Sequence, residues 1–215
     1  MEWICRNAFH LFDKTKLETL EYPISIGLHP WHSDRFNSQL AEKISAALEA
    51  KNVVAIGETG LDKVCKIPWN QQLAAWTFQF ELAQKKSLPI IIHCVKAYYE
   101  FIPFCKNSKV PMLFHGFLGN EEILKGLSRF ETSYFSFGNS IFQNLKIQEL
   151  ILKVNLNRLL LETDTGPFTI EQVYEKAASI LGLDLASIES LLKKNALEFF
   201  GKNAFHNFGE NSIEK

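Results

Sequence analysis

The sequence predicts an α/β fold, in which a parallel β-sheet is covered by helices, and a single domain over residues 1–215. Short, continuous runs of β-branched and other apolar residues are typical of strands that are buried on both faces. Longer segments with the period of amphipathic helices alternate with these runs. No repeat, low-complexity tract or linker interrupts the alternation, so the pattern indicates either a barrel or an open, doubly wound sheet.

Six apolar runs are the predicted strands, and a weaker seventh candidate lies at Trp3–Cys5. In chain order the six runs are Ile24–Leu28, Val53–Gly57, Pro89–His93, Met112–His115, Tyr134–Phe137 and Leu159–Glu162. Three of the segments between or after them carry apolar residues at three- and four-residue steps, which predicts helices with one buried face. These faces are Leu40, Ile44, Ala47 and Leu48; Leu73, Trp76, Phe80 and Ala83, between Asn70 and Ser87; and Ile188, Leu191, Leu192 and Phe199. Pro89 ends the second helix, and Gly201 is a candidate C-cap of the last one.

The composition excludes several classes of protein. Apolar residues make up 47% of the chain, which argues against intrinsic disorder. A net charge of -1 argues against general coating of nucleic acid, although it leaves room for a local phosphate site around a metal ion. No apolar run has the roughly 18–20 residues of a membrane span, and no secretory signal is evident. We therefore expect a cytoplasmic protein without a membrane partner, and its four cysteines, which form no Cys-x-x-Cys pair, to be free thiols.

Ionisable residues occur where the predicted strands end. His29, Glu58, His93, His115 and Asp164 each lie at or just after the end of a different apolar run. In a parallel α/β fold the carboxyl ends of the strands share one face, and that face carries the active site. Glutamate, histidine and aspartate are ligands for a divalent ion such as Zn, Mn or Mg. The pattern thus predicts that remote parts of the chain meet in a metal site.

Each residue also has a structural alternative. A lone histidine after a strand is often only a hydrogen-bonded residue, which applies to His29 and His32. Glu58 follows a glycine and could cap the next helix, and Asp164 could be a turn former. Recurrence on strand after strand favours the shared site, because buried ionisable groups are costly unless they are paired or bound to metal.

Seven stretches together carry a family resemblance. They are Gly27–His32, Ala55–Asp62, Leu88–His93, Phe114–Gly119, Ser136–Gly138, Leu160–Asp164 and Asn195–Gly201. In this order and at this spacing, from about residue 24 to residue 201, they resemble the TatD family of metal-dependent hydrolases. The resemblance implies a TIM-type (β/α) barrel and metal-dependent hydrolysis of phosphodiester bonds, typically in DNA.

The resemblance also implies roles for individual residues. Glu58 corresponds to a carboxylate that bridges two metals, and His93 and His115 correspond to ligands of one of them. Asp164 corresponds to the residue that binds the other metal and orients or deprotonates the attacking water. His29 and Lys96 are candidate substrate contacts, although a solvated lysine at a helix start is the favoured interpretation of Lys96.

One family feature is missing from the chain. The family's first strand ends in His-x-His, which supplies two ligands to one metal, and this sequence has no such pair near its start. The resemblance therefore predicts an incomplete barrel of about seven strands, with the first strand missing and two sheet edges open. The start could be truncated, the site could have degenerated, or His10 or a partner chain could fill the gap. We expect one or two divalent ions per chain, and either a monomer or a dimer through the open edge.

The function predicted from these features is a metal-dependent hydrolase of the deoxyribonuclease type with reduced activity. DNA, as short or single-stranded ends, or a small phosphoester would be its substrate, and Trp31 and Phe117 could stack on bases. Two alternatives stay open: a TatD-like binding protein without turnover, and a hydrolase of a small amide, ester or phosphoester.

Overall fold

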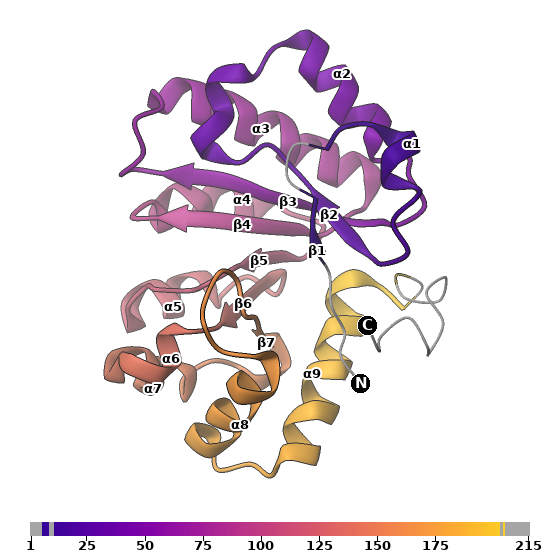
Figure 1. Cartoon of the computed structure of the whole chain (residues 1–215). Helices are drawn as coiled ribbons and strands as arrows, with labels where there is room; N and C mark the ends of the chain where they lie inside the picture. The colour runs from indigo at the N-terminus through magenta and orange to yellow at the C-terminus, as the bar shows by residue number, and fades with distance from the viewer. Residues whose placement is uncertain (1–5, 9–10, 203, 205–215) are drawn as a thin grey trace.

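The computed structural model describes residues 6–8, 11–202 and 204, and its centre is one curled sheet of parallel strands (Figure 1). The strands are β1 (Arg6–Asn7), β2 (Ile24–Ile26), β3 (Val53–Asp62), β4 (Ile90–Val95), β5 (Met112–Phe114), β6 (Ser133–Phe137) and β7 (Leu159–Leu161). They lie in the sheet in the same order as in the sequence, and every neighbouring pair is parallel. All the carboxyl ends therefore lie on one face, which is the geometry of a (β/α) barrel.

Helices follow the strands and cover the outside of the sheet. They are α1 (Lys14–Leu17), η1 (Pro30–Arg35), α2 (Ser38–Ala47), α3 (Trp69–Lys86), η2 (Tyr98–Phe101), α4 (Ile102–Asn107), α5 (Glu121–Leu127), α6 (Ser140–Gln143), α7 (Leu145–Ile151), η3 (Leu156–Arg158), α8 (Ile170–Leu181) and α9 (Leu185–Phe200), where η marks a 3-10 helix. In Figure 1, α2 and α3 lie over the part of the sheet around β2 and β3, and α5 to α8 surround the part around β6 and β7.

The six predicted strands are all present, and β3 differs most from its predicted length. β3 continues to Asp62, five residues beyond the predicted end at Gly57, because Thr59 to Asp62 pair with Ile92 to Val95 of β4. A search for apolar runs misses this extension because it contains the polar residues Glu58, Thr59 and Asp62. The first described strand is Arg6–Asn7, whereas the candidate Trp3–Cys5 lies outside the described residues.

Within the described residues the barrel is open, in agreement with the predicted incomplete barrel of about seven strands. β1 and β7 are the two ends of the sheet order, and within the described residues no strand pairs with the outer edge of either. A cavity lined by Arg6 and Asn7 of β1 and by Leu160 and Leu161 of β7 lies between the two edges.

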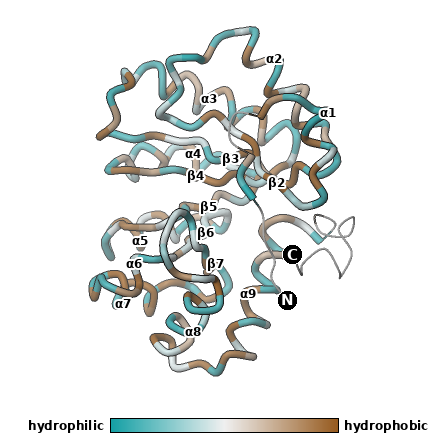
Figure 2. Tube along the Cα trace, viewed as in Figure 1, coloured by the Kyte–Doolittle hydropathy of each residue, from teal (hydrophilic) through white to brown (hydrophobic). Residues whose placement is uncertain are grey.

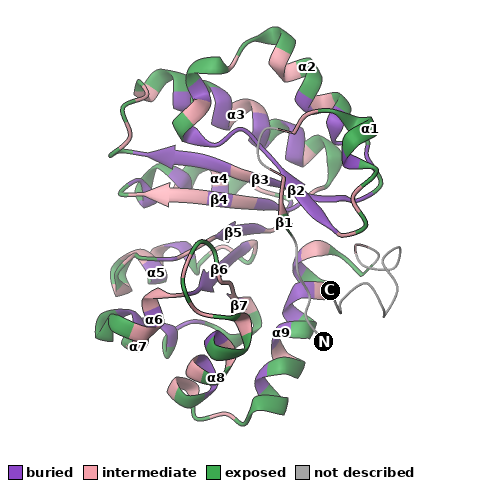
Figure 3. Ribbon diagram, in the orientation of Figure 1, coloured by how far each residue is buried: buried purple, intermediate pink, exposed green. Residues whose placement is uncertain are grey.

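The core lies between the sheet and the helices. Figure 3 shows β3 buried along its length, whereas β4 becomes partly exposed toward its carboxyl end, where His93 lies. In Figure 2, hydrophobic and hydrophilic segments alternate along the outer helices, as expected when one helix face is buried. Trp76, Phe80 and Ala83 face the core as predicted, but Leu73 is 37% exposed and the prediction for it was wrong. Gln72 takes the buried position instead, because its amide has partners there.

Two buried glutamines of α3 hold the ends of β2 and β3. Gln72 accepts a hydrogen bond from the Asp62 backbone N–H (2.8 Å) and donates to its carbonyl (3.1 Å). Gln79, two turns later, does the same for Leu28 at 2.7 and 3.1 Å, and also donates to the Thr59 hydroxyl (2.6 Å). Both glutamines are therefore satisfied in the core, and each fixes backbone beside an ionisable residue at a strand end.

The final helix closes the structure on β7. Asn195 of α9 is fully buried and donates to the carbonyls of Leu156 (2.6 Å) and Leu159 (2.7 Å), at the start of β7. Gly201, with φ 88°, is the C-cap of α9, as predicted. A glycine suits this conformation because it has no Cβ to clash.

Two further expectations concern the chain as a whole. None of the helices in the described ranges is long and apolar enough to cross a membrane. Cys65, Cys94 and Cys105 are free thiols, as expected, and Cys5 lies outside the described residues.

We predict that Gln79→Leu destabilises the protein by about 2–4 kcal/mol, because the backbone groups of Leu28 would stay buried without partners. Urea unfolding measures the change. Gln71→Leu is the matched control, since Gln71 is exposed on the same helix, and we expect it to change stability by less than about 0.5 kcal/mol. Equal stability of the two variants would contradict the role assigned to Gln79.

Candidate active site

The ionisable residues of five strand ends meet at the carboxyl face of the sheet. His29 follows β2, Glu58 lies within β3, His93 lies within β4, and His115 follows β5. Because Glu58 is part of a strand, the alternative that it caps a helix is wrong. Glu162 and Asp164 follow β7, on the far side of the same face.

The distances within this group are short. Glu58 Oε2 lies 3.3 Å from His115 Nε2 and 3.7 Å from His29 Nε2. The ring centroids of His29 and His93 are 4.3 Å apart, and those of His93 and His115 are 5.9 Å apart. One ligand atom from each of His29, Glu58 and His93 lies within 4.8 Å of the other two. Two imidazoles and a carboxylate at this spacing fit a divalent cation.

Gly60 allows the two ligand-bearing strands to approach. It pairs with His93 across β3 and β4, and its φ is 152°. A Cβ at this position would lie 1.9 Å from the His93 carbonyl oxygen. Glycine is therefore required between Glu58 and Asp62 if β4 is to bring His93 to the cluster.

Hydrogen bonds indicate which nitrogen of His29 and of His93 carries the proton. His29 Nδ1 accepts the backbone N–H of Trp31 at 3.2 Å, which puts the proton on Nε2, facing Glu58. His29 is then a hydrogen-bond donor rather than a metal ligand. His93 Nε2 contacts Asp62 Oδ2 at 3.3 Å, and a proton shared there leaves the Nδ1 lone pair for a cation.

A carboxylate also contacts the ring of His115. Its Nδ1 contacts Glu162 Oε1 at 3.3 Å, while its Nε2 faces Glu58. Ser136 donates a hydrogen bond to the other oxygen of Glu162. A carboxylate behind a histidine orients a metal ligand and raises its basicity. These contacts favour Glu58, His93 and His115 as the cation ligands. His29 is close to Glu58 and His93, but its Nδ1 is bonded to the Trp31 backbone N–H rather than to a carboxylate that would orient it as a ligand.

The pKa values of the histidines diverge. Burial, and then the neighbouring His93, lower the pKa of His29 to about 3. Burial also lowers the pKa of His93, against the opposing bond to Asp62. Burial alone would lower the pKa of His115, but the hydrogen-bonding carboxylates Glu162 and Glu58 outweigh it and hold this pKa well above 6.5. His115 is thus the charged imidazole of the cluster at neutral pH.

The acids respond to the same surroundings. Burial would raise the pKa of Glu58, but the contact with His115 and the nearby histidines bring it below its ordinary value. Burial would also raise the pKa of Asp62, but the bonds from Trp31 and other donors lower it. Asp164 shows the opposite result, because burial and the charge of Glu162 raise its pKa.

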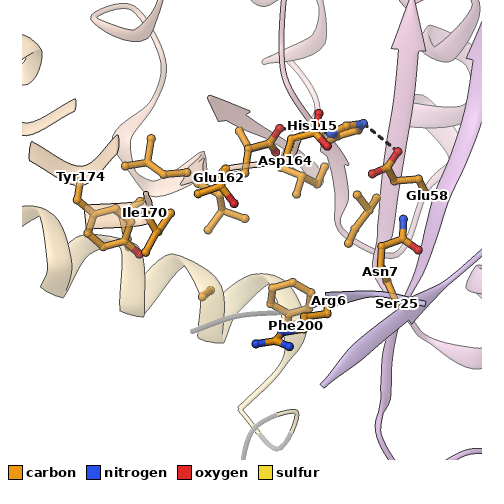
Figure 4. Close-up of a pocket in the computed structure, with 18 of the residues that line it drawn as sticks. Arg6, Asn7, Ser25, Glu58, His115, Glu162, Asp164, Ile170, Tyr174 and Phe200 are labelled. Atoms are coloured by element: carbon orange, nitrogen blue, oxygen red, sulfur yellow. Dashed lines mark hydrogen bonds and ion pairs between the residues drawn. The ribbon is translucent and has the colours of Figure 1, made fainter. Parts of the chain in front are cut away.

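Asp164 shares a cavity with the cluster. The cavity has a volume of about 540 Å³ and lies where β1 and β7 fail to meet (Figure 4). Glu58, His115, Glu162 and Asp164 line one part of it, and Asn7 of β1 points toward Glu58 from the other side. Both polar atoms of the Asn7 amide are buried there with no hydrogen-bond partner in the described part of the chain. Asp164 itself is exposed, with φ 47°, a conformation that also suits a turn.

Three other candidates do not line this cavity, although Trp31 lies beside the histidines. Lys96 is exposed after β4, with φ 54°, and does not line this cavity. Trp31 is 56% exposed, and its ring centroid lies 5.9 Å from that of His93. Phe117 is fully buried in the core, so it cannot stack on a base. His10 lies outside the described residues.

Sequence reasoning missed Asp62 and Glu162 as supporting carboxylates. The only signal in the sequence was that each is an acidic residue close to a predicted ligand at a strand end, Asp62 near Glu58 and Glu162 near Asp164. Asn7 offered no such signal, since an isolated asparagine next to a short strand is common.

The fold is similar to solved structures of hydrolases. A TatD homologue from Escherichia coli K12 matches with a TM-score of 0.77 at 24% identity, over 87% of this chain and 80% of that one. An uncharacterised amidohydrolase from Saccharomyces cerevisiae matches with a TM-score of 0.70 at 14% identity, over 91% and 88% of the two chains. These likenesses establish the fold.

Sequence relatives point the same way. A protein of Yersinia pseudotuberculosis named "3'-5' ssDNA/RNA exonuclease TatD" is 32% identical over 173 residues, which are 74% of this chain and 65% of that protein. The protein of the same name from Erwinia amylovora is 29% identical over 203 residues, 81% of this chain and 76% of its own length. The profile of the "TatD related DNase" family matches residues 12–201, which include every strand from β2 to β7. The chain therefore belongs to the TatD-related DNase family.

Proposed function

We propose that this protein is a metal-dependent hydrolase of phosphodiester bonds, acting on nucleic acid ends. The observation that carries the proposal is the contact of Glu58 with His115 at the carboxyl face of the sheet. Glu58 also lies close to His29 and His93, and His115 also contacts Glu162. Membership of the TatD-related DNase family supports the same chemistry.

Glu58, His93 and His115 would hold one divalent cation: Zn, Mg or Mn. A cation bound there supplies positive charge that polarises a phosphate and makes a nearby water more acidic. Asp164 would take part in holding a second cation.

The residues around the cation would bind the phosphate, accept a proton from water and orient the ligands. His29 would donate a hydrogen bond from its Nε2–H to a phosphate oxygen, because its Nδ1 accepts a hydrogen bond from the Trp31 backbone. Asp164 would take a proton from the attacking water, since its raised pKa makes it a stronger base than an ordinary aspartate. Asp62 and Glu162 would keep His93 and His115 oriented.

The substrate would be DNA or RNA with a single-stranded end, or a small phosphoester. The names of the two relatives support single strands. The net charge of -1 argues for few phosphate contacts, of which Lys96 would make one. We place this activity in the cytoplasm, in keeping with the free thiols in the described part of the chain. A dimer paired through the open edges of β1 and β7 remains a prediction.

The two alternatives are separated by direct assays. A binding protein without turnover would hydrolyse nothing with any added cation. A hydrolase of small amides or esters would cleave those substrates and leave oligonucleotides intact. The orphaned Asn7 amide in the cavity is compatible with a small ligand, and this keeps the second alternative open.

We predict that Asp164→Asn lowers the hydrolysis of a single-stranded oligonucleotide by about 10²–10⁴-fold, because the amide cannot accept the proton. Glu58→Gln should lower it at least as much, through loss of the cation. Glu175→Gln changes an exposed acid of α8 and is the matched control. Cleavage is measured with added Mg, Mn or Zn, and unchanged rates in both site variants would exclude this mechanism.

We also predict that binding of Mn²⁺ near neutral pH releases about one proton, which comes from His115. The sign follows from its pKa, which is raised, so that this imidazole is charged before the cation binds. Calorimetry in two buffers with different ionisation enthalpies counts the protons.

Matched histidine variants assign the released proton. His115→Gln should abolish proton release. His93→Gln should weaken binding but keep the release, because the pKa of His93 is lowered and this residue is already neutral. Release of no proton by the unchanged protein would remove His115 from the ligand set.

A further inference from the structure

Four large apolar side chains stand exposed in the segments that follow the strands carrying the histidines and Glu58. They are Trp31 (56% exposed), Val64 (61%), Tyr99 (56%) and Leu118 (62%). Each follows the carboxyl end of one of four consecutive strands, β2 to β5. We call these four residues the rim. Since all the strands are parallel, the rim lies on the face that carries Glu58 and the histidines.

The loops that carry the rim are tied to one another. Trp31 Nε1 donates to Asp62 Oδ2 (2.7 Å), which joins the loops after β2 and β3. Lys63 forms an ion pair with Glu100 (2.7 Å), which joins the next two. The Leu118 backbone donates to the Tyr98 hydroxyl (3.0 Å), which joins the loops after β4 and β5. Exposed side chains held on fixed loops lose little freedom when they bind a ligand.

The rim contributes little to the core, so its exposure needs another explanation. Exposed apolar groups that gather beside a polar site mark a binding surface. The other large exposed apolar side chains of the described chain, such as Leu145 of α7 and Leu185 of α9, lie on helices away from the rim.

We propose that the rim binds the unpaired bases of a single-stranded nucleic acid, next to the phosphate that is cleaved. The proposal rests on the proposed function and adds where the strand lies. Trp31 carries the argument, because its ring packs at 4.8 Å from the His29 ring and 5.9 Å from the His93 ring. A base stacked on its exposed side lies directly beside the cluster.

Charge and shape favour a nucleic acid over an apolar protein partner. Lys66 and Lys96 are exposed in the same loops as Val64 and Tyr99, whereas Lys63 is paired with Glu100. A shallow hollow lined by Asp62, Lys63, Trp69 and Glu100 lies in these loops, and the Trp69 ring lies 5.6 Å from the Lys63 ammonium group. Alternating aromatic and cationic groups are the usual platform for single strands, and stacking makes the recognition tolerant of sequence.

The test uses Tyr99→Ala with Leu118→Ala, because neither side chain belongs to the cluster. Tyr99→Phe keeps the ring, and Leu145→Ala removes a comparably exposed leucine far from the rim. Binding of a fluorescent single-stranded deoxyadenosine oligomer is measured with cations chelated, so that nothing is cleaved. Hydrolysis of a small phosphodiester without a base is measured separately with Mn²⁺.

We expect the rim variants to bind the oligomer about tenfold more weakly and the two control variants to bind within about twofold of the unchanged protein. Hydrolysis of the small phosphodiester should be the same in all of them. Affinity that is equal in every variant, no binding by the unchanged protein, or an equal loss for duplex DNA would overturn the proposal. A change of oligomeric state without a change of oligomer affinity would assign the rim to protein contacts instead.

The outcomes also separate this proposal from the proposed function. Loss of oligomer binding in the rim variants, in a protein that cleaves nothing with any cation, would keep the rim and remove the hydrolase. Cleavage of the small phosphodiester, with oligomer binding unaffected by the rim variants, would keep the hydrolase and remove the rim.

Discussion

The contact between Glu58 and His115 is the interaction on which the site depends, because it joins β3 to β5 at the carboxyl face of the sheet. Neither residue would be stable there alone, since an isolated charge in a partly buried position costs several kcal/mol. Glu162 provides the second contact of His115. The result is a chain of charges that connects three strands, and the proposed cation would bind at its Glu58 end.

Residues of α3 and β3 hold the backbone of the strands that carry these charges. Gln72 and Gln79 of α3 bind the backbone beside Asp62 and His29, and Gly60 allows β4 to lie close to β3. Polar residues in the core are thus used to fix the strand ends, at positions where apolar packing alone would leave the register less well defined.

Much of the fold follows from the sequence, because continuous apolar runs and helical periodicity report burial directly. The seven parallel strands and the open barrel agree with the prediction. The end of β3 was not predictable from apolar runs, since Thr59 and Asp62 are polar residues that are buried with hydrogen-bond partners from other parts of the chain. The prediction that Leu73 is buried was wrong for a related reason. The neighbouring Gln72 is buried instead, because it has backbone partners that only the folded chain provides.

The candidate site was predictable in part. Glu58, His93 and His115 meet as expected, whereas the supporting roles of Asp62 and Glu162 depend on distances of 3.3 Å between residues far apart in the chain. The tautomer of His29 depends on a single backbone contact, which no motif records. Sequence patterns therefore indicate which residues gather, and the contacts decide what each of them can do.

Anomalous diffraction from crystals soaked in Mn²⁺ tests the central claim most directly. The account predicts a peak within bonding distance of Glu58 Oε, His93 Nδ1 and His115 Nε2, with His29 outside the coordination sphere. A peak bound to His29 and not to His115, or no peak at this face of the sheet, would contradict it.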